Sequence, residues 1–457
     1  MPDGRPLARL ALALVLLSSA GSSCRKSSRP VGDAGGAGGA GDLAGAALWS
    51  ACIEDWPKSG TPHRAKPSLT VAAPSVRWQS DPLDGLQRST DPAGPILSAG
   101  RLALQSGDWV YFVSKDGSSV QTVKYNAMGA FPSGLVADQE GNVYYTAPDG
   151  VYSLAPAGNL RWLAQHGAVA GEFAQGIPPV LGPDGVVYAV TFDQRVGAYR
   201  ASDGSQLWSQ PAPSDPCCSS AVMGGGGSAV FVAIGETETV ALRTGTGARL
   251  GAFVRPAYGR SFTWGWGSWV LGWDIGIADS HTYVFDTCGA LKWPPGSTGA
   301  SGVVAVGELL VTGDNSSLRL FDTAGNPAAG PAAGEGRPVA AGADGTIYTF
   351  RCDSSPPAVN RVLAYSADLQ ELWRLDLGGS SCLQITGNVV LDDDGVMYMM
   401  RAAPDVAVGT QVLAIQTASP GLADSSWPSW RHDNRGTAWL VANSTEPVDA
   451  STDTGGP

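Results

Sequence analysis

The sequence is poor in charged side chains and in histidine. Charged residues make up 15% of its 457 residues, and acidic residues outnumber basic ones by 41 to 29. Proteins that bind nucleic acid neutralise phosphates with a basic surface, so this balance argues against such partners. The four histidines include no pair at metal-ligand spacing. No Gly-x-Ser-x-Gly nucleophile elbow occurs, and the Gly224–Gly227 run precedes an expected strand rather than a helix, which argues against a phosphate-binding loop.

Glycine and proline, in contrast, are plentiful. The chain has 61 Gly and 32 Pro, and 43% of its residues are hydrophobic. The hydrophobic share is sufficient for a packed core, and the turn-forming residues are typical of short strands joined by tight turns. This composition favours an all-β protein over a helical bundle or a disordered chain. At about 150 residues per domain the length suggests three domains, unless the chain is built from repeats.

Residues 1–23 have the pattern of a secretory signal peptide. Arg5 and Arg9 precede the apolar run Leu10–Leu17, and small residues follow up to Cys24. The run is too short for a membrane helix, and no later stretch reaches the roughly 18 apolar residues that one requires. Bacterial lipoproteins are acylated on a cysteine that follows small residues, so the sequence predicts Cys24 as a lipid attachment site. Gly21 stands where such signals usually carry an aliphatic residue, and cleavage after Ala20 is the alternative.

The rest of the chain divides by composition. Residues 24–50 are expected to form a flexible Gly/Ala-rich tether, because this composition cannot bury a core. Residues 51–73 are an N-terminal segment, residues 74–442 the folded domain and residues 443–457 a polar, disordered tail. If Cys24 is acylated, six cysteines remain, an even number that suits disulfides in an oxidising compartment. We therefore expect an exported, membrane-anchored lipoprotein at the outer membrane, in the periplasm or at the cell surface.

A phrase of about 40 residues recurs from residue 74 to residue 416. Each copy combines an Asp-Gly turn, a strand with Tyr, a second strand, a turn with Gly and a strand with Trp. Clear copies begin at Gly141, Asp184, Tyr283, Asp344 and Asp394, and weaker copies surround Tyr111, Phe231 and Leu310. A unit of this length with four short strands matches one blade of a β-propeller.

The tryptophans measure the period of this repeat. Trp162 and Trp208 are 46 residues apart, and the next steps, to Trp293 and Trp373, are 85 and 80 residues, or two units each. Outer strands at or near residues 78, 133, 162, 208, 251, 293, 329 and 373 predict eight blades. The short step from 133 to 162 leaves seven as the alternative. We therefore predict one all-β propeller of four-stranded blades.

The two ends of the repeat region predict how the ring closes. Trp78 is an outer-strand tryptophan with no blade before it, and the last copy, which ends near Gln416, lacks an outer strand. Pairing these two segments would cover both unpaired edges. The N-terminal strand is thus predicted to complete the last blade.

These motifs resemble the pyrroloquinoline-quinone (PQQ)-like repeat propellers over about residues 74–416. Residues 427–437, Trp-Pro-Ser-Trp-Arg-His-Asp-Asn-Arg-Gly-Thr, resemble a Trp-Pro-x-x-Arg-His-Asp segment that often flanks such propellers, and Asp55–Pro57 is a fainter version. We expect this segment, with His432 and Asp433, to dock against the propeller as a hydrogen-bonded plug. The resemblance specifies the fold, whereas the family includes both quinone dehydrogenases and non-catalytic lipoproteins.

The resemblance to quinoprotein dehydrogenases implies PQQ and Ca²⁺. Some of those enzymes carry a vicinal disulfide near the cofactor, and Cys217 and Cys218 are adjacent here. The family's Ca²⁺ ligands, base and stacking Trp have no residue-by-residue match, so no catalytic residue is assigned and no cofactor or metal is expected. We favour a structural role for this cysteine pair.

Cys352 and Cys382 form a candidate disulfide, because both lie in loops that open on the same face of a four-stranded blade. Sequence alone predicts no pairing for Cys52 and Cys288. Asp392–Gly395 occupies the place of Asp-Gly turns in other copies, so we expect a hairpin turn and not a metal site.

Trp264 and Trp266 are the candidate ligand-stacking residues. They lie in a Gly-spaced aromatic run before an expected inner strand, and residues two apart on a strand point the same way. Near the central funnel they could stack on a sugar, peptide or quinone, with Arg260 adding charge. Packing between blades is the alternative.

Two functions remain open. The first is a lipid-anchored, monomeric propeller that binds an envelope protein or polymer without catalysis. In this it resembles the propeller subunit of the outer-membrane β-barrel assembly machine, although that subunit's partner-binding residues cannot be matched here. The second is a PQQ-dependent dehydrogenase with Ca²⁺.

Overall fold

The chain folds into strands and turns. The computed structural model describes residues 66–70, 73–83, 93–106, 109–124, 134–166, 178–212, 222–226, 229–234, 238–254, 261–265, 269–273, 282–286, 302–307, 309–313, 317–322, 326–328, 334–353, 359–378, 389–402, 410–423, 429, 433–435 and 439–440. All of these residues belong to the unit Leu43–Pro457. They contain no helix, and hence none long and apolar enough to cross a bilayer. The all-β prediction is confirmed.

The strands described here form eight antiparallel sheets, one of which gains a short parallel strand. The first three contain β2 (Ala93–Ser98), β3 (Arg101–Ser106), β4 (Trp109–Ser114) and β5 (Val120–Lys124); β6 (Val136–Ala137), β7 (Val143–Ala147), β8 (Gly150–Leu154) and β9 (Leu160–Gln165); and β10 (Val180–Leu181), β11 (Val186–Thr191), β12 (Arg195–Arg200) and β13 (Gln206–Pro211). The next three contain β14 (Val222–Gly226), β15 (Ala229–Ile234), β16 (Glu238–Arg243), β17 (Arg249–Val254) and β31 (Trp439–Leu440); β18 (Ser261–Gly265), β19 (Trp269–Trp273) and β20 (Thr282–Asp286); and β21 (Gly302–Val306), β22 (Leu309–Gly313) and β23 (Leu318–Phe321). The last two contain β24 (Arg337–Ala341), β25 (Ile347–Asp353), β26 (Val359–Tyr365) and β27 (Glu371–Gly378); and β28 (Val390–Leu391), β29 (Val396–Ala402), β30 (Thr410–Gln416) and β1 (Ser75–Gln79).

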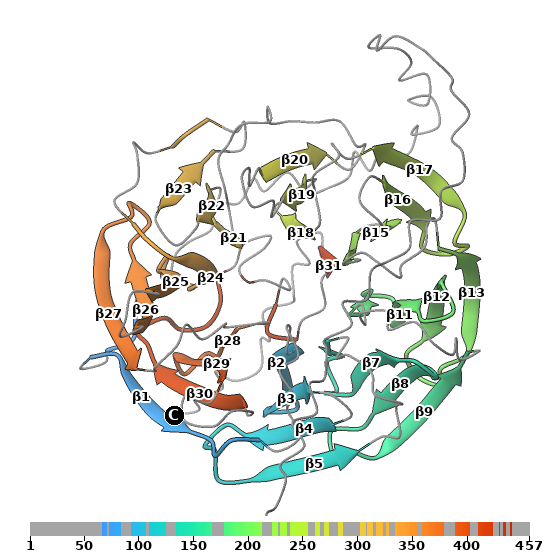
Figure 1. Ribbon diagram of the computed structural model, residues 1–457, viewed down its shortest axis with the longest axis horizontal. Coiled ribbons are helices and arrows are strands. Elements are labelled where there is room, and N and C mark those ends of the chain that lie inside the picture. The colour runs from blue at the N-terminus through green and yellow to red at the C-terminus, as the bar shows by residue number, and fades with distance from the viewer. Residues whose placement is uncertain are drawn as a thin grey trace, which may run out of the picture. The chain divides into compact units, whose positions relative to one another are not determined.

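The sheets follow one another around a ring; the strand named first for each sheet above lies innermost, and in the last sheet the N-terminal strand β1 is outermost (Figure 1). The second strands are apolar on both faces because each is covered by a neighbouring sheet; all six residues of β11, for example, are buried. The outer strand β27 instead alternates exposed and half-buried residues. The β-propeller fold is thereby confirmed. Because β18–β20 and β21–β23 have three strands each within the described residues, the choice between eight and seven blades stays a prediction.

The N-terminal strand closes the ring as predicted. β1 pairs antiparallel with β30, with Ser75 opposite Gln416 and Gln79 opposite Leu413. Arg401 and Gln411 add side-chain contacts across this seam, because the guanidinium of Arg401 donates to Gln79 Oε1 at 2.9 Å and Gln411 Nε2 donates to the carbonyl of Ser80 at 3.0 Å. The terminal strand therefore covers the edge that β30 would otherwise expose.

One predicted outer strand was placed wrongly. The sequence suggested an outer strand near residue 133, whereas the outer strand of that sheet is β5, Val120–Lys124. β5 carries no tryptophan, so the marker that identified the other outer strands is missing here. The step from β5 to the strand of Trp162 is accordingly one ordinary blade.

Three interfaces between sheets repeat one arrangement. An outer-strand tryptophan donates its indole N–H to a backbone carbonyl in the third turn of the following sheet. The three pairs are Trp78–Lys115 (2.9 Å), Trp162–Ala201 (2.9 Å) and Trp208–Thr244 (2.6 Å). A glycine of the same turn lies against each indole; a Cβ on Gly204, which has φ +74°, would stand 2.6 Å from the ring of Trp162. Small Gly and large Trp are therefore required together.

A tyrosine of the second strand completes this arrangement. Tyr144 packs on Trp162 with ring centroids 5.7 Å apart, and its hydroxyl donates to Asp138 in the first turn at 2.6 Å. Burial, reinforced by Asp138, raises the pKa of the Tyr144 phenol. The Asp-Gly-x-x-Tyr and Leu-x-Trp elements of the repeat thus meet at the contacts between blades.

The turns define two faces of the ring. We call the end that carries the first and third turns of each sheet face 1; in sheet β6–β9 these are residues 138–142 and 155–159. The opposite end, with the second turn at residues 148–149, is face 2. Asp392–Gly395 is a first turn on face 1, where Gly395 N–H donates to the Asp392 carbonyl at 2.9 Å, as expected of a hairpin.

Candidate functional site

Most of the predicted site residues fall outside the described residues. These are Cys24, Cys217, Cys218, Cys382, Arg260 and Trp266. Trp264 lies within β18 itself rather than before an inner strand, and its backbone is opposite Val270 of β19. Its role in stacking on a ligand stays a prediction. Cys352 lies in β25 and is disulfide-bonded, and its pairing with Cys382 likewise stays a prediction.

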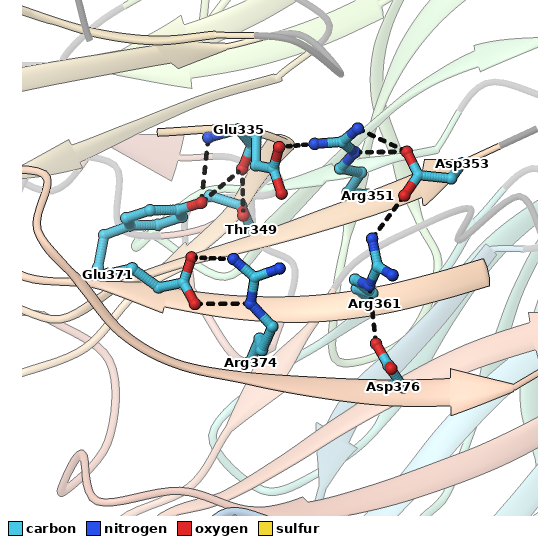
Figure 2. Close-up of polar contacts among 9 residues, drawn as sticks. Glu335, Thr349, Arg351, Asp353, Arg361, Glu371, Arg374 and Asp376 are labelled. Carbon is cyan, nitrogen blue, oxygen red and sulfur yellow. Dashed lines mark hydrogen bonds and ion pairs between the residues drawn. The ribbon is translucent and has the colours of Figure 1, made fainter. Parts of the chain in front are cut away.

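The best-defined polar cluster lies on sheet β24–β27, toward face 2. Arg351 of β25 and Arg361 of β26 stand directly opposite each other. Two like charges at such a position repel, and Asp353 offsets this by accepting from both guanidinium groups (Figure 2). The contacts are 2.7 Å from Arg351 Nε and 2.5 Å from Arg361 Nη1. The alternation of charge therefore holds the ends of β25 and β26 together.

Two further carboxylates extend this ion-pair network, which consists of Glu335, Arg351, Asp353, Arg361 and Asp376. Glu335 pairs with Arg351, and Asp376 of β27 accepts from Arg361 Nε at 2.8 Å. Four of the five side chains are only about a quarter exposed, whereas Asp376 is 60% exposed. Each arginine bridges two carboxylates through charge-assisted hydrogen bonds in a partly buried setting, so the network presents a rigid charged surface.

The segment before β24 is held against the same sheet. Tyr365 accepts from the backbone N–H of Glu335 at 3.0 Å, and the Thr349 hydroxyl donates to the Glu335 carbonyl at 2.9 Å. Burial raises the pKa of Tyr365 to about 12, so its hydroxyl stays neutral at ordinary pH. Beside it, Arg374 holds the pKa of Glu371 below its ordinary value (Figure 2). These contacts favour rigidity and recognition; none presents an activated nucleophile or base.

On face 1 the chain's own C-terminal part covers the ends of the inner strands. We call the described residues 417–423, 429, 433–435 and 439–440 the closing segment. Its main-chain and amide contacts are Ala423 N–H to Ala341 O (2.8 Å), Ala343 N–H to Gly421 O (2.9 Å), Leu97 N–H to Asn434 O (2.7 Å), Ala137 N–H to Arg435 O (3.0 Å), Leu391 N–H to Asn434 Oδ1 (2.9 Å) and Asn434 Nδ2–H to Leu391 O (2.8 Å). β31 also pairs in parallel with Gly225 and Gly226 of β14. The closing segment thus engages the inner strands of five sheets.

A quinone with Ca²⁺ requires an open axial site and a cradle of oxygen ligands. Among the described residues, no group of three His, Cys, Asp or Glu side chains is placed to hold a metal ion. The closing segment, moreover, occupies hydrogen-bonding positions at the face-1 ends of β2, β6, β14, β24 and β28. On face 1 these described strand ends are therefore taken up by the chain itself, and the expectation that no PQQ or Ca²⁺ is bound stays a prediction.

Sequence reasoning missed the ion-pair network. Arg351 and Arg361 are ten residues apart with a loop between them, so nothing short of the strand register indicates that they face each other. The period-two charge pattern Arg351-x-Asp353 was the available signal, since both side chains lie on one face of a strand.

Comparison with known proteins agrees with this architecture. A family model described as "Outer membrane protein assembly factor BamB" matches residues 42–253. No curated protein matches the sequence. Solved structures with a similar fold include BamB from Moraxella catarrhalis, which has 16% sequence identity and a TM-score of 0.51 and for which the match covers 76% of this chain and 98% of that one.

Two further similar structures differ widely in origin. The quinohemoprotein alcohol dehydrogenase ADHIIG from Pseudomonas putida HK5 has 14% identity and a TM-score of 0.53, with 80% of each chain covered. Sqt1 from Saccharomyces cerevisiae has 11% identity and a TM-score of 0.53, with 78% of this chain and all of that chain covered. At such low identity these likenesses establish the fold alone. The resemblance to the PQQ-like repeat propellers is nevertheless confirmed, because the chain matches the BamB family model over residues 42–253 and folds as a β-propeller.

Proposed function

We propose that this protein is a non-catalytic binding scaffold of the bacterial cell envelope, anchored by a lipid on Cys24. The observation that carries the proposal is the match of residues 42–253 to the BamB family model within a propeller fold. The ion-pair network also supports the proposal, because it offers rigid charged groups for recognition rather than an acid–base pair.

The arrangement of the faces supports the same function. Because the closing segment occupies the inner-strand ends on face 1, we expect partners to bind at face 2 or on the rim. Asp376 on the outer strand β27 is exposed and belongs to the rigid network, so it is a suitable position for a probe.

A photo-cross-linking residue at Asp376 tests this expectation in intact cells. We expect a discrete cross-linked product with one envelope protein or polymer from Asp376, and none from Asp203, a similarly exposed aspartate on face 1. Identical product patterns from both positions, or no product from either, would contradict the proposed partner face.

Acylation is tested separately on the full chain. Radiolabelled palmitate should be incorporated into the wild-type protein and not into Cys24→Ala, and the wild type should fractionate with membranes. Labelling that survives the substitution would refute the anchor, because no other residue is proposed to carry it.

The alternative function is a PQQ-dependent dehydrogenase, favoured by the structural likeness to a quinohemoprotein alcohol dehydrogenase. Its test is tryptophan fluorescence of the purified protein with PQQ and Ca²⁺, together with dye-linked alcohol oxidation. We expect neither quenching at micromolar cofactor nor turnover. Saturable quenching with turnover would overturn the scaffold proposal in favour of the enzyme.

A further inference from the structure

The seam between the last sheet and the first is the point at which the ring closes. β1 covers this seam at the rim, where it pairs with the outer side of β30. The inner strands of the same two sheets, β28 and β2, lie toward the centre of the ring, and two further strands separate β28 from β1 (Figure 1). Closure by β1 therefore does not explain how the inner ends of the two sheets are held together.

Asn434 connects these two inner strands. Its side-chain amide forms a pair of hydrogen bonds with Leu391, the last residue of β28, because Oδ1 accepts from the Leu391 N–H at 2.9 Å and Nδ2 donates to the Leu391 carbonyl at 2.8 Å. Its backbone carbonyl accepts from the N–H of Leu97 in β2 at 2.7 Å. One residue thus bridges the last and the first sheet on the inner side of the seam.

The chemistry of the amide suits this position. An asparagine side chain carries an acceptor and a donor side by side, as a peptide group does, and can therefore pair with the N–H and the C=O of one strand residue. Leu391 is fully buried, so neither of its backbone groups has solvent as a substitute partner. An aspartate in place of Asn434 would lose the donor, and an aliphatic side chain would lose both groups.

The residues around Asn434 fix its position across the seam. Asp433 Oδ1 accepts from the Arg435 N–H at 3.0 Å, which closes a tight turn around Asn434. The Arg435 carbonyl in turn accepts from the N–H of Ala137 in β6 at 3.0 Å. The earlier part of the closing segment bonds to β24 and to the turn that follows it. The contacts of the closing segment therefore follow the inner strands in ring order, from β24 through β28 and β2 to β6.

An ion pair joins the same two sheets next to this contact. Lys115 lies in the third turn of the first sheet, and Asp392 lies in the first turn of the last sheet, directly after Leu391. Lys115 Nζ and Asp392 Oδ2 are 2.7 Å apart, and the Asp392 side chain is only 3% exposed. Salt screens a partly buried pair much less than a pair in open solvent. The seam thus has two links to which β1 contributes no atom.

We propose that Asn434 and the Lys115–Asp392 ion pair form an inner latch, which holds the last sheet and the first sheet together when β1 leaves β30. The propeller then has an outer closure that can open and an inner closure that stays shut. Release of β1 exposes the edge of β30 on a ring that is still closed. The latch goes beyond the scaffold function, and it requires neither a lipid on Cys24 nor a partner at face 2.

Hydrogen–deuterium exchange of the full chain, followed by mass spectrometry, reports the two closures separately. Trp78→Ala loosens β1, because it removes the packing of the indole and its hydrogen bond to the Lys115 carbonyl. We expect faster exchange in β1 and β30 of this variant and unchanged protection in β2 and β28. Acceleration of β2 and β28 as large as that of β30 would show that β1 alone closes the ring, and would overturn the latch.

Asn434→Leu nearly preserves the shape of the side chain and removes both of its hydrogen bonds. We expect exchange to be about tenfold faster in β28 and also in β2, with β10 unchanged, and faster still when Trp78→Ala is added. Asn326→Leu is the matched control, because the Asn326 amide donates to Asp322 within its own turn on face 1; it should leave β2 and β28 unchanged.

Two outcomes of the Asn434 variant contradict the latch. Acceleration in β28 alone would mean that a single strand end had lost its partner, and acceleration in β10 as large as in β2 would mean that the whole ring had loosened. If Asn434→Leu does not fold, Asn434→Asp replaces it, because aspartate keeps the acceptor for the Leu391 N–H and loses only the donor. The same pattern with a smaller increase is then expected, and the same two outcomes would overturn the proposal.

Discussion

Two interfaces between neighbouring sheets fill the same space in opposite ways. Between β6–β9 and β10–β13, Trp162 reaches forward from the outer strand onto the third turn of the next sheet, where Gly204 leaves room for it. Between β21–β23 and β24–β27, the third turn carries Leu369 at the position of Gly204, with φ +58°, and this leucine packs back into the interface. When the outer strand supplies a large side chain, the third turn of the next sheet carries a glycine; in the second interface the turn itself supplies the large side chain.

The comparison also indicates what an interface can tolerate. A non-glycine residue with positive φ costs about 1–3 kcal/mol, whereas burial of a leucine side chain contributes about 1.5–3 kcal/mol. Leu369 is 4% exposed, so its burial offsets the strained backbone. A third solution occurs after β5, where Gln121 replaces the tryptophan and donates to the Ala157 carbonyl of the next third turn at 2.6 Å. The hydrogen bond to that turn is kept even where the indole is lost.

The largest expected effect is the loss of an indole. Trp162→Ala should lower the free energy of unfolding by about 3–5 kcal/mol, because it leaves a cavity and removes the hydrogen bond to Ala201. Urea denaturation followed by circular dichroism measures this change. Leu160→Ala is the matched control on the same strand, since Leu160 is 48% exposed and should change stability by at most about 0.5 kcal/mol. Equal losses in the two variants would remove the distinction between the interface and the rim.

Leu369 tests the other interface. Leu369→Ala should cost about 2–5 kcal/mol, because the buried contacts are lost while the strained backbone remains. Leu369→Gly loses the same contacts but relieves the strain, so it should be about 1 kcal/mol less destabilising than the alanine variant. The order of the two denaturation midpoints decides the question. If the glycine variant were the less stable one, backbone strain at this turn would be negligible.

Gly204 is expected to have a smaller effect, which can be separated into two parts. Gly204→Ala meets both an unfavourable φ of +74° and the ring of Trp162, and it should cost about 2–3 kcal/mol. Gly185→Ala meets a similar φ of +70° with open space around it, so about 1 kcal/mol is expected. In a Trp162→Ala background the excess at Gly204 should disappear, as a double-mutant cycle would measure. If Gly204→Ala remained more destabilising than Gly185→Ala in the Trp162→Ala background, the clash at Gly204 would have to come from a neighbour other than Trp162.

The smallest effect at neutral pH belongs to the tyrosines. Burial, followed by the charge of Asp184, raises the pKa of Tyr188, and burial raises those of Tyr199 and Tyr365 to about 12. Unfolded tyrosine ionises near pH 10. The folded state, which keeps these tyrosines neutral, therefore has its full stability below pH 10 and loses stability relative to the unfolded state as the pH rises toward 12. Tyr188→Phe should change stability by at most about 1 kcal/mol at pH 7 and should reduce the loss between pH 10 and 12. Parallel wild-type and variant curves over that range would contradict the assignment.

The repeat predicted the strands because its markers act locally. Asp-Gly turns, second-strand tyrosines and outer-strand tryptophans each contact a fixed position within their own repeat or the next one, so their spacing carries the fold. β1 was predicted to pair with β30 for a related reason, since Trp78 had no blade before it. The outer strand β5 was missed because Gln121 performs the hydrogen bonding that a tryptophan performs elsewhere.

The candidate sites were less accessible to sequence reasoning. The pairing of Arg351 with Arg361 depends on strand register across a loop, and the contact of Asn434 with Leu391 depends on where the closing segment crosses the ring. The role of a polar side chain can be inferred only when the groups that surround it in the fold are known. Trp264 and Trp266 were predicted because they lie two residues apart in a Gly-spaced aromatic run, whereas single glutamine and aspartate residues in strands and turns form no such pattern.

The pairing of β1 with β30 has a consequence for how the molecule is made. The two strands are separated by about 340 residues, yet they lie side by side in one sheet. A chain that is synthesised from its N-terminus presents β1 long before its partner strand, so the ring cannot close until β30 has been made. Until β1 docks, β30 is paired only with β29 and its outer edge is exposed, so a chaperone that acts on this protein would meet an open strand edge there.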